Sequence, residues 1–277
     1  MTGSDDPNDR IAIRAHYYQQ FDADYSLDVP AEGYGGWRTA TLEISRRHSA
    51  LVVMHAWGTG TPEQYPGWWR AVEYMPRAQS ILQDVFPPLL RAARHSGFRV
   101  YHVAGGGSYA RRFPGYHRTV ELAGPEPPSA EPIEPDPVLL ELRAFRAANV
   151  HVGTHNEEDV AKGFAALDFA PQAYPQDNEA IAETGRQLLA LCRADGVNHL
   201  IYAGFALNWC LLLSPGGMGE MARYGLMCSI LRQATTAVEN RETARRELCK
   251  EVALWRVALA FGFVFDVDDF VAAIQRR

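Results

Sequence analysis

From residue 49 to the C-terminus, short apolar runs alternate with amphipathic stretches of helical period. Leu51 to Met54 is a continuous apolar run, which is typical of a parallel strand covered on both faces. Further strands are expected at residues 98–103, 197–206, 226–231 and 261–266. Helices are expected at residues 77–95, 137–148, 178–195, 207–224, 239–260 and 267–275. This alternation predicts a three-layer α/β/α sandwich around a mostly parallel, doubly wound sheet.

The segments outside this alternation divide the chain. Residues 1–48 are expected to form an N-terminal tail and an aromatic arm that lies over the domain or over a neighbouring subunit, and residues 49–277 form the α/β domain. Residues 104–137 are rich in glycine and proline and are expected to be a long insertion loop, acting as a lid or an interface. The pair Pro87-Pro88 is expected to kink the helix at 77–95 or to divide it in two.

Composition excludes several classes of protein. Hydrophobic residues make up 47% of the 277, which is enough for a substantial core. The net charge of −6 and the lack of a basic stripe argue against a nucleic acid or membrane partner. The chain has no apolar run of membrane-spanning length, and its N-terminus is polar rather than a signal peptide. The four cysteines stand singly, which indicates reduced thiols and a cytoplasmic protein.

Two chemically capable side chains fall at the carboxyl ends of expected strands, where ligands bind in such sheets. His55 directly follows the run at 51–54, and Cys210 lies in the first turns of the helix after Ala203-Gly204. Free amides at a helix start favour a thiolate and can bind an oxyanion. Cys210 is therefore a candidate nucleophile; the alternative is a small buried hydrophobe, which is the role we assign to the other three cysteines.

Lys162 is a third candidate. It lies in the segment HNEEDVAKGFAALDF, to which we assign strand character. Lysine is ordinarily a solvated surface charge, so Lys162 is a candidate only when it is considered together with His55 and Cys210.

The segment GVNHLIYAGFALNWC, with an apolar strand ending at His55 and a later lysine, resembles the isochorismatase-like cysteine hydrolases. That superfamily includes nicotinamidases and N-carbamoylsarcosine amidase, and the resemblance covers about residues 49–275. Gly204, Phe205 and Ala206 match the family's turn, which usually holds a cis peptide before the residue that matches Ala206. Cys210 matches the nucleophile, Lys162 the lysine, and His55 stands where the family has an aspartate.

The resemblance implies hydrolysis of a C–N bond in a small amide, ureide or carbamoyl compound through a thioacyl enzyme. In that scheme Cys210 attacks, His55 takes the thiol proton, Lys162 stabilises the anion, and amides near Ala206 and Cys210 form the oxyanion hole. A neutral imidazole can accept a thiol proton, so the histidine is compatible with hydrolysis. The alternative is a descendant of the fold that only binds a small ligand or a protein partner.

The remaining features concern ligands and partners. Trp57, Asn208 and Trp209 adjoin the candidate residues and are expected to line a pocket for a small, flat, amide-like substrate. The stretch GGGS at 105–108 lacks the context of a phosphate loop and is expected to be flexible. The stretch VYHVAGGGSYARR lacks the family's metal-binding aspartate, so we expect His102 to be a core or pocket-wall residue, with no metal and no cofactor. The resemblance further implies a homo-oligomer, a dimer or a tetramer.

Overall fold

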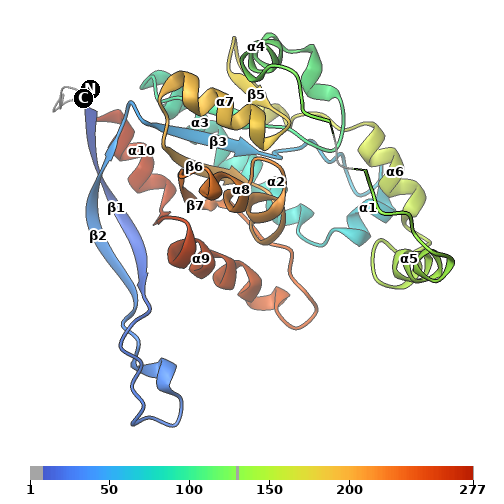
Figure 1. Ribbon diagram of the computed structural model, residues 1–277, viewed down its shortest axis with the longest axis horizontal. Coiled ribbons are helices and arrows are strands. Elements are labelled where there is room, and N and C mark those ends of the chain that lie inside the picture. Colours follow the sequence, from blue (N-terminus) through green and yellow to red (C-terminus); the bar gives the residue numbers. More distant parts are fainter. Residues whose placement is uncertain (1–8, 129–130, 277) are drawn as a thin grey trace.

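The computed structural model describes residues 9–128 and 131–276. Residues 1–8, which belong to the expected N-terminal tail at residues 1–10, lie outside the described residues, and Arg10 already begins the first strand. In the described part of the chain, eight strands form one sheet in the order β2-β1-β8-β7-β6-β3-β4-β5 (Figure 1). The strands are β1 (Arg10–Gln19), β2 (Gly36–Ser45), β3 (Ser49–Met54), β4 (Val100–Val103), β5 (Ala180–Ala182), β6 (His199–Gly204), β7 (Met227–Thr235) and β8 (Val264–Phe265).

The sheet is parallel from β8 to β5 and becomes antiparallel only where β1 joins β8 and β2 joins β1. The helices are α1 (Pro66–Ala71), α2 (Met75–Asp84), α3 (Phe86–His95), α4 (Pro114–Ala123), α5 (Pro137–Asn149), α6 (Glu157–Ala165), α7 (Gly185–Asp195), α8 (Met218–Arg223), α9 (Leu248–Ala260) and α10 (Val267–Gln275). Helices α2, α3 and α10 pack on one face of the sheet and α7, α8 and α9 on the other. The predicted α/β sandwich around a mostly parallel, doubly wound sheet is confirmed.

Strand β3 shows why the run from Ala50 to Met54 is apolar. Leu51 and Val53 pack into a core cluster with α2, α3 and α10, whereas Val52 and Met54 pack into a second cluster with α7, α8 and α9. Successive side chains of a strand point to opposite faces, so a strand covered on both faces has no polar position. All six residues of β3 are buried.

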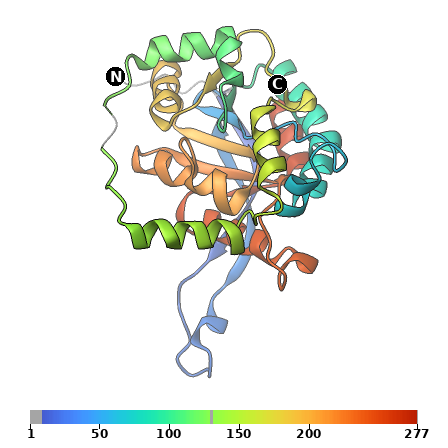
Figure 2. The ribbon, with the colours of Figure 1, turned by 90° about the vertical axis from the view of Figure 1, so that its right-hand side faces the viewer.

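The aromatic residues near the N-terminus belong to a long β-hairpin. Strands β1 and β2 pair over their full length, and β1 continues the sheet through two residues of β8. The far end of the hairpin extends away from the rest of the domain (Figures 1 and 2). The segment therefore adds two strands to the edge of the sheet, and only its tip stands out as an arm.

Several expected helices are shorter or divided. The helix expected at 77–95 is two helices, α2 and α3, which meet at Val85 just before the proline pair. The helix expected at 178–195 begins at Gly185, because the Thr184 side chain accepts a hydrogen bond from the amide of Gln187 and so caps it. The helix expected at 207–224 is a short π-helix (Leu207–Leu211) followed by α8, with Gly216-Gly217 between them.

Two further segments differ from expectation. The expected insertion loop at 104–137 contains α4, which packs against α7 and β5. The helix expected at 239–260 begins only at Leu248; before it lies a short 3-10 helix. Among the described residues, no helix combines the length and the apolar character that crossing a membrane requires.

Candidate functional site

The tips of β3 and β6 bring the two principal candidates to the same edge of the sheet. The two strands are parallel neighbours in which Met54 lies opposite Gly204. The amide of Phe205 donates a hydrogen bond of 3.1 Å to the carbonyl of Met54, so the register continues past the ends of both strands. His55 follows Met54, and the turn that leads to Cys210 follows Gly204. The predicted placement at the carboxyl edge of the sheet is confirmed for both residues.

His55 is buried at the tip of β3, with 8% of its surface exposed. Its amide donates to the carbonyl of Val103 at 3.0 Å, and its backbone adopts a φ of 50°, in the left-handed region. The Nδ1 atom has no hydrogen-bond partner among the described residues. Burial lowers the pKa of His55 to about 4, so the imidazole is neutral at neutral pH. A buried ring nitrogen without a partner calls for an explanation, and a bound molecule that supplies the missing partner is one.

A closed set of contacts fixes the orientation of the His55 ring. The indole of Trp57 stacks on it, and the indole Nε1 donates to the hydroxyl of Tyr109 at 2.7 Å. The amide of Gly105 donates to the same hydroxyl at 3.3 Å. A Cβ atom on Gly105 would lie 2.7 Å from Nε2 of His55, so only glycine fits beside the ring. Gly105 therefore has a packing role, whereas the stretch 105–108 was expected to be merely flexible.

Tyr109 is a member of the site that the sequence did not identify. It is buried, and burial raises the pKa of its hydroxyl to about 12, so the hydroxyl stays protonated. The oxygen accepts two hydrogen bonds, which leaves its own proton free to donate. Tyr109 lies 54 positions after His55, so no local pattern links the two. The available signal was an aromatic residue in the loop after the neighbouring strand β4.

Cys210 lies in the π-helix that follows the β6 turn, and its side chain is partly buried. The peptide bond between Phe205 and Ala206 is cis, as the resemblance implied. Gly204 has a φ of 131°, and a Cβ atom there would lie 1.8 Å from the carbonyl oxygen of Met54. This position therefore requires glycine. Among the described residues, no hydrogen bond joins the thiol of Cys210 to His55.

Tyr74 directly precedes α2 and packs, partly buried, against the core cluster that includes α2 and α3. Burial raises the pKa of Tyr74, and the charge that Cys210 carries as a thiolate raises it further, so the hydroxyl stays protonated.

Lys162 does not join this site. The segment expected to have strand character is α6, with three acidic residues in its first turn. The ammonium of Lys162 pairs at 2.6 Å with Glu158, one helical turn earlier, and 57% of the lysine side chain is exposed. This pair raises the pKa of Lys162. Glutamate four residues before lysine is a favourable helical spacing, which accounts for the surface position. The assignment of Lys162 as the anion stabiliser therefore has no support in the geometry.

Asn208 and Trp209 also differ from the pocket role that was expected. The side-chain amide of Asn208 donates to the carbonyl of Val238 at 2.9 Å, and its oxygen accepts from the amide of Val238 at 2.9 Å. Both polar ends of Asn208 are thus used to hold the loop after β7. Trp209 is 59% exposed and faces solvent, whereas Trp57 packs beside His55 as expected.

A carboxylate does follow the tip of a neighbouring strand, but it has other partners. Glu183 comes directly after β5, and its Oε2 accepts a hydrogen bond of 3.0 Å from the hydroxyl of Tyr116 and lies 3.4 Å from Nε of Arg111. Its Oε1 is buried without a partner among the described residues. His102 is fully buried and pairs with Glu179 at 2.9 Å, which agrees with the expected core role. In the described ranges, no three His, Cys, Asp or Glu side chains gather into a group that could hold a metal ion.

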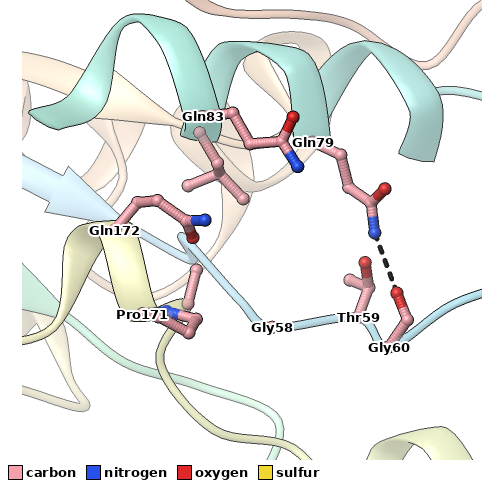
Figure 3. A pocket seen from close by; sticks show the side chains of 9 residues that line it. Gly58, Thr59, Gly60, Gln79, Gln83, Pro171 and Gln172 are labelled. Carbon is pink, nitrogen blue, oxygen red and sulfur yellow. Dashed lines mark hydrogen bonds between the residues drawn. The ribbon is translucent and has the colours of Figure 1, made fainter.

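A polar cleft of about 180 Å³ lies beside the segment that follows His55 (Figure 3). The backbone of residues 58–60 forms one wall, and the side chains of Gln79, Gln83 and Gln172 contribute amide groups. The amide of Gln79 donates to the carbonyl of Gly60 at 2.8 Å. Neither His55 nor Cys210 lines the cleft, and none of its lining residues is charged.

Comparison with known proteins finds similarity in structure only. No protein family and no curated protein matches the sequence. A cysteine hydrolase from Pseudomonas syringae pv. phaseolicola 1448A superposes with a TM-score of 0.50 at 16% identity, over 84% of this chain and 94% of that one. An isochorismatase-like hydrolase from Alkaliphilus metalliredigens gives 0.45 at 15% identity, over 82% and 98%. N-carbamoylsarcosine amidase from Thermoplasma acidophilum gives 0.42 at 13%, over 80% and 97%.

The chain shares the α/β fold of the cysteine hydrolase from Pseudomonas syringae pv. phaseolicola 1448A.

Proposed function

We propose that the protein is a cysteine-dependent hydrolase that cleaves a C–N bond in a small amide, ureide or carbamoyl compound. Cys210 is the nucleophile and His55 is the proton acceptor. The observation that carries the proposal is His55 itself: a buried, neutral ring with an unpartnered Nδ1, at the strand tip beside the turn that leads to a partly exposed thiol.

In the proposed reaction, His55 accepts the thiol proton and the sulfur of Cys210 attacks the carbonyl carbon of the substrate. The C–N bond breaks as the imidazolium returns the proton to the leaving nitrogen, and a thioester remains on Cys210. Water, deprotonated by His55, then hydrolyses the thioester to release the acid and the free thiol. The net change is the addition of one water across the C–N bond, so the reaction needs no cofactor.

Two groups stabilise the negative charge that develops in this scheme. The amide of Ala206 donates no hydrogen bond among the described residues, although Ala206 is buried, so it is free to stabilise an oxyanion beside Cys210. The pKa of Tyr74 responds to a charge on Cys210, and we assign its protonated hydroxyl to stabilising the thiolate without a formal charge. Lys162 has no part in the scheme, because it pairs with Glu158 on the surface of α6.

The low pKa of His55 limits its strength as a base in the resting site. A thiolate formed beside it attracts the imidazolium and raises that pKa, so the proton transfer depends on the two groups acting as a pair. This coupling makes His55 the residue whose removal should most affect the reactivity of Cys210.

A second candidate is a descendant of the fold that binds a small ligand without hydrolysing it. The position of Lys162 favours this alternative, since the lysine that the resemblance assigns to the site pairs instead with Glu158 on α6. The uncharged cleft in Figure 3 would suit a neutral polar ligand.

The test is the release of ammonia or amine from a panel of small amides, ureides and carbamoyl compounds. The variants are Cys210→Ser and His55→Ala, with Cys249→Ser as a matched control because Cys249 is also a partly buried free thiol. Release by the parent and by the Cys249 variant, lost in the other two, supports the proposal. Release that survives Cys210→Ser, or no release from any compound, contradicts it.

A further inference from the structure

Helix α5 is an apolar helix without a packing partner. All 13 of its residues are exposed. Its five large apolar side chains are between 37% and 63% exposed: Val138, Leu139, Leu140, Leu142 and Phe145. Both ribbon views show α5 at the margin of the domain, away from the sheet and with no helix packed on it (Figures 1 and 2). Such a concentration of exposed apolar surface marks an interaction site.

The helix is not expected to be stable in isolation. A helix of 13 residues is marginal in water, and most helical stability in proteins comes from packing of an apolar face. The Asp136 side chain caps its start, accepting hydrogen bonds from the amides of Val138 and Leu139. The cap stabilises the first turn of the helix, but the apolar residues beyond it still need another surface to pack against. The chain flanking α5 is apolar and exposed as well, at Ile133 and Val150.

The charges on and around α5 are separated along its axis. The acidic residues Glu134, Asp136 and Glu141 lie toward the N-terminal end, whereas Arg143 and Arg146 lie toward the C-terminal end. None of these five side chains forms an ion pair with another described residue. The helix therefore presents an acidic half and a basic half that remain uncompensated within the chain.

We infer that α5 forms the interface between two copies of this chain, with the two helices packed antiparallel across a two-fold axis near residue 142. This arrangement places the acidic half of each helix beside the basic half of the other and covers the apolar residues of both. A parallel arrangement would place like charges together. A two-fold interface is self-complementary, and a helix whose two halves carry opposite charge meets that requirement by itself. The antiparallel helix dipoles favour the same arrangement.

The first test is sedimentation velocity of the full chain, comparing the parent with the double variant Leu142→Asp/Phe145→Asp. Val252→Asp serves as the control, since Val252 is an equally exposed apolar residue on another helix, α9. The parent and the control should be dimers at micromolar concentration, and the α5 variant a monomer with an unchanged circular dichroism spectrum. A monomeric parent overturns the inference, and it would mean that α5 binds a different protein. A dimer that survives the α5 substitutions does so too.

The second test addresses orientation. In an antiparallel pair, Arg143→Glu/Arg146→Glu places acid beside acid and should weaken the dimer by about tenfold or more, since each exposed charge pair contributes up to about 1 kcal/mol. Adding Glu134→Arg/Glu141→Arg reverses both halves and should restore the dimer. Charge reversal at the two arginines that leaves the dissociation constant unchanged is the result expected of a parallel pair, and it contradicts the antiparallel arrangement.

Discussion

The rings of His55 and Trp57 lie parallel, with centroids 4.7 Å apart and an angle of 16° between their planes. Trp57 in turn donates to Tyr109, and the Tyr109 hydroxyl also accepts from Gly105, which packs beside His55. The orientation of the proposed base is thus fixed by residues on two successive strand-tip loops. This relationship gives the first two predictions.

Tyr109→Phe removes the acceptor for two donors, the indole of Trp57 and the amide of Gly105. Leaving buried donors unpaired should lower the free energy of unfolding by about 1–3 kcal/mol. Chemical denaturation measures the change, and Tyr25→Phe is the control, because Tyr25 is 87% exposed. Equal stability of the two variants would show that the hydrogen bonds around Tyr109 do not hold the site.

Gly105→Ala introduces a Cβ atom 2.7 Å from Nε2 of His55 and should displace the ring. Overpacking of this kind destabilises by about 1–3 kcal/mol, and loss of the ring's orientation should also reduce the reactivity of Cys210. Gly107→Ala is the matched control, since the nearest atom to a Cβ there is 3.5 Å away. Thermal unfolding and thiol labelling of both variants test the prediction; indistinguishable variants would refute it.

The stability of the protein should fall on mild acidification. The pKa of His55 is about 4 in the folded protein and about 6.5 when exposed, so between these values the unfolded chain binds a proton that the folded chain does not. The contribution of His55 to the free energy of unfolding is therefore fully present above pH ~6.5 and is lost as the pH falls toward ~4. This contribution is up to about 3 kcal/mol. Buried His199, whose pKa is also lowered to about 4, adds to the same effect.

Urea unfolding between pH 4 and 7.5 separates the contribution of His55. The variant His55→Asn should show a shallower dependence than the parent, whereas His151→Asn, at an exposed position, should match the parent. An identical pH dependence in parent and His55→Asn would mean that the histidine is not held neutral by the fold.

Lys162→Met should leave both hydrolysis and thermal stability essentially unchanged, because its ion pair with Glu158 is exposed to solvent. Amide release and thermal unfolding of this variant provide the measurement. A loss of activity comparable to that of His55→Ala would show that Lys162 takes part in catalysis.

Much of the fold could be predicted from the sequence because it depends on local pattern. The apolar run at 51–54 and the glycine turn at 204 each specify a strand end, and together they specify the edge of the sheet that carries His55 and Cys210. The division of the helix at Pro87-Pro88 follows from the geometry of proline. These features needed no knowledge of tertiary contacts.

The contacts that complete the site could not be predicted in this way. The hydrogen bond between Trp57 and Tyr109 joins residues 52 positions apart, and the clasp of Asn208 on Val238 joins residues 30 positions apart. Lys162 is different, because its local signal was present in the sequence. The acidic run Glu157–Asp159 and the spacing of Glu158 from Lys162 are typical of an exposed helix. A prediction of a surface helix from these two features would have been correct.

The most direct test of the proposed function is the pH dependence of iodoacetamide alkylation at each cysteine, read by peptide mass spectrometry in the parent and in His55→Ala. Cys192 and Cys228 are internal controls, since burial raises the pKa of each to about 12 and both should label slowly. We predict rapid labelling of Cys210 at neutral pH, and much slower labelling of Cys210 when His55 is removed. Slow labelling of Cys210, or a profile unchanged by His55→Ala, would contradict the pairing of His55 with Cys210 on which the proposed hydrolysis depends.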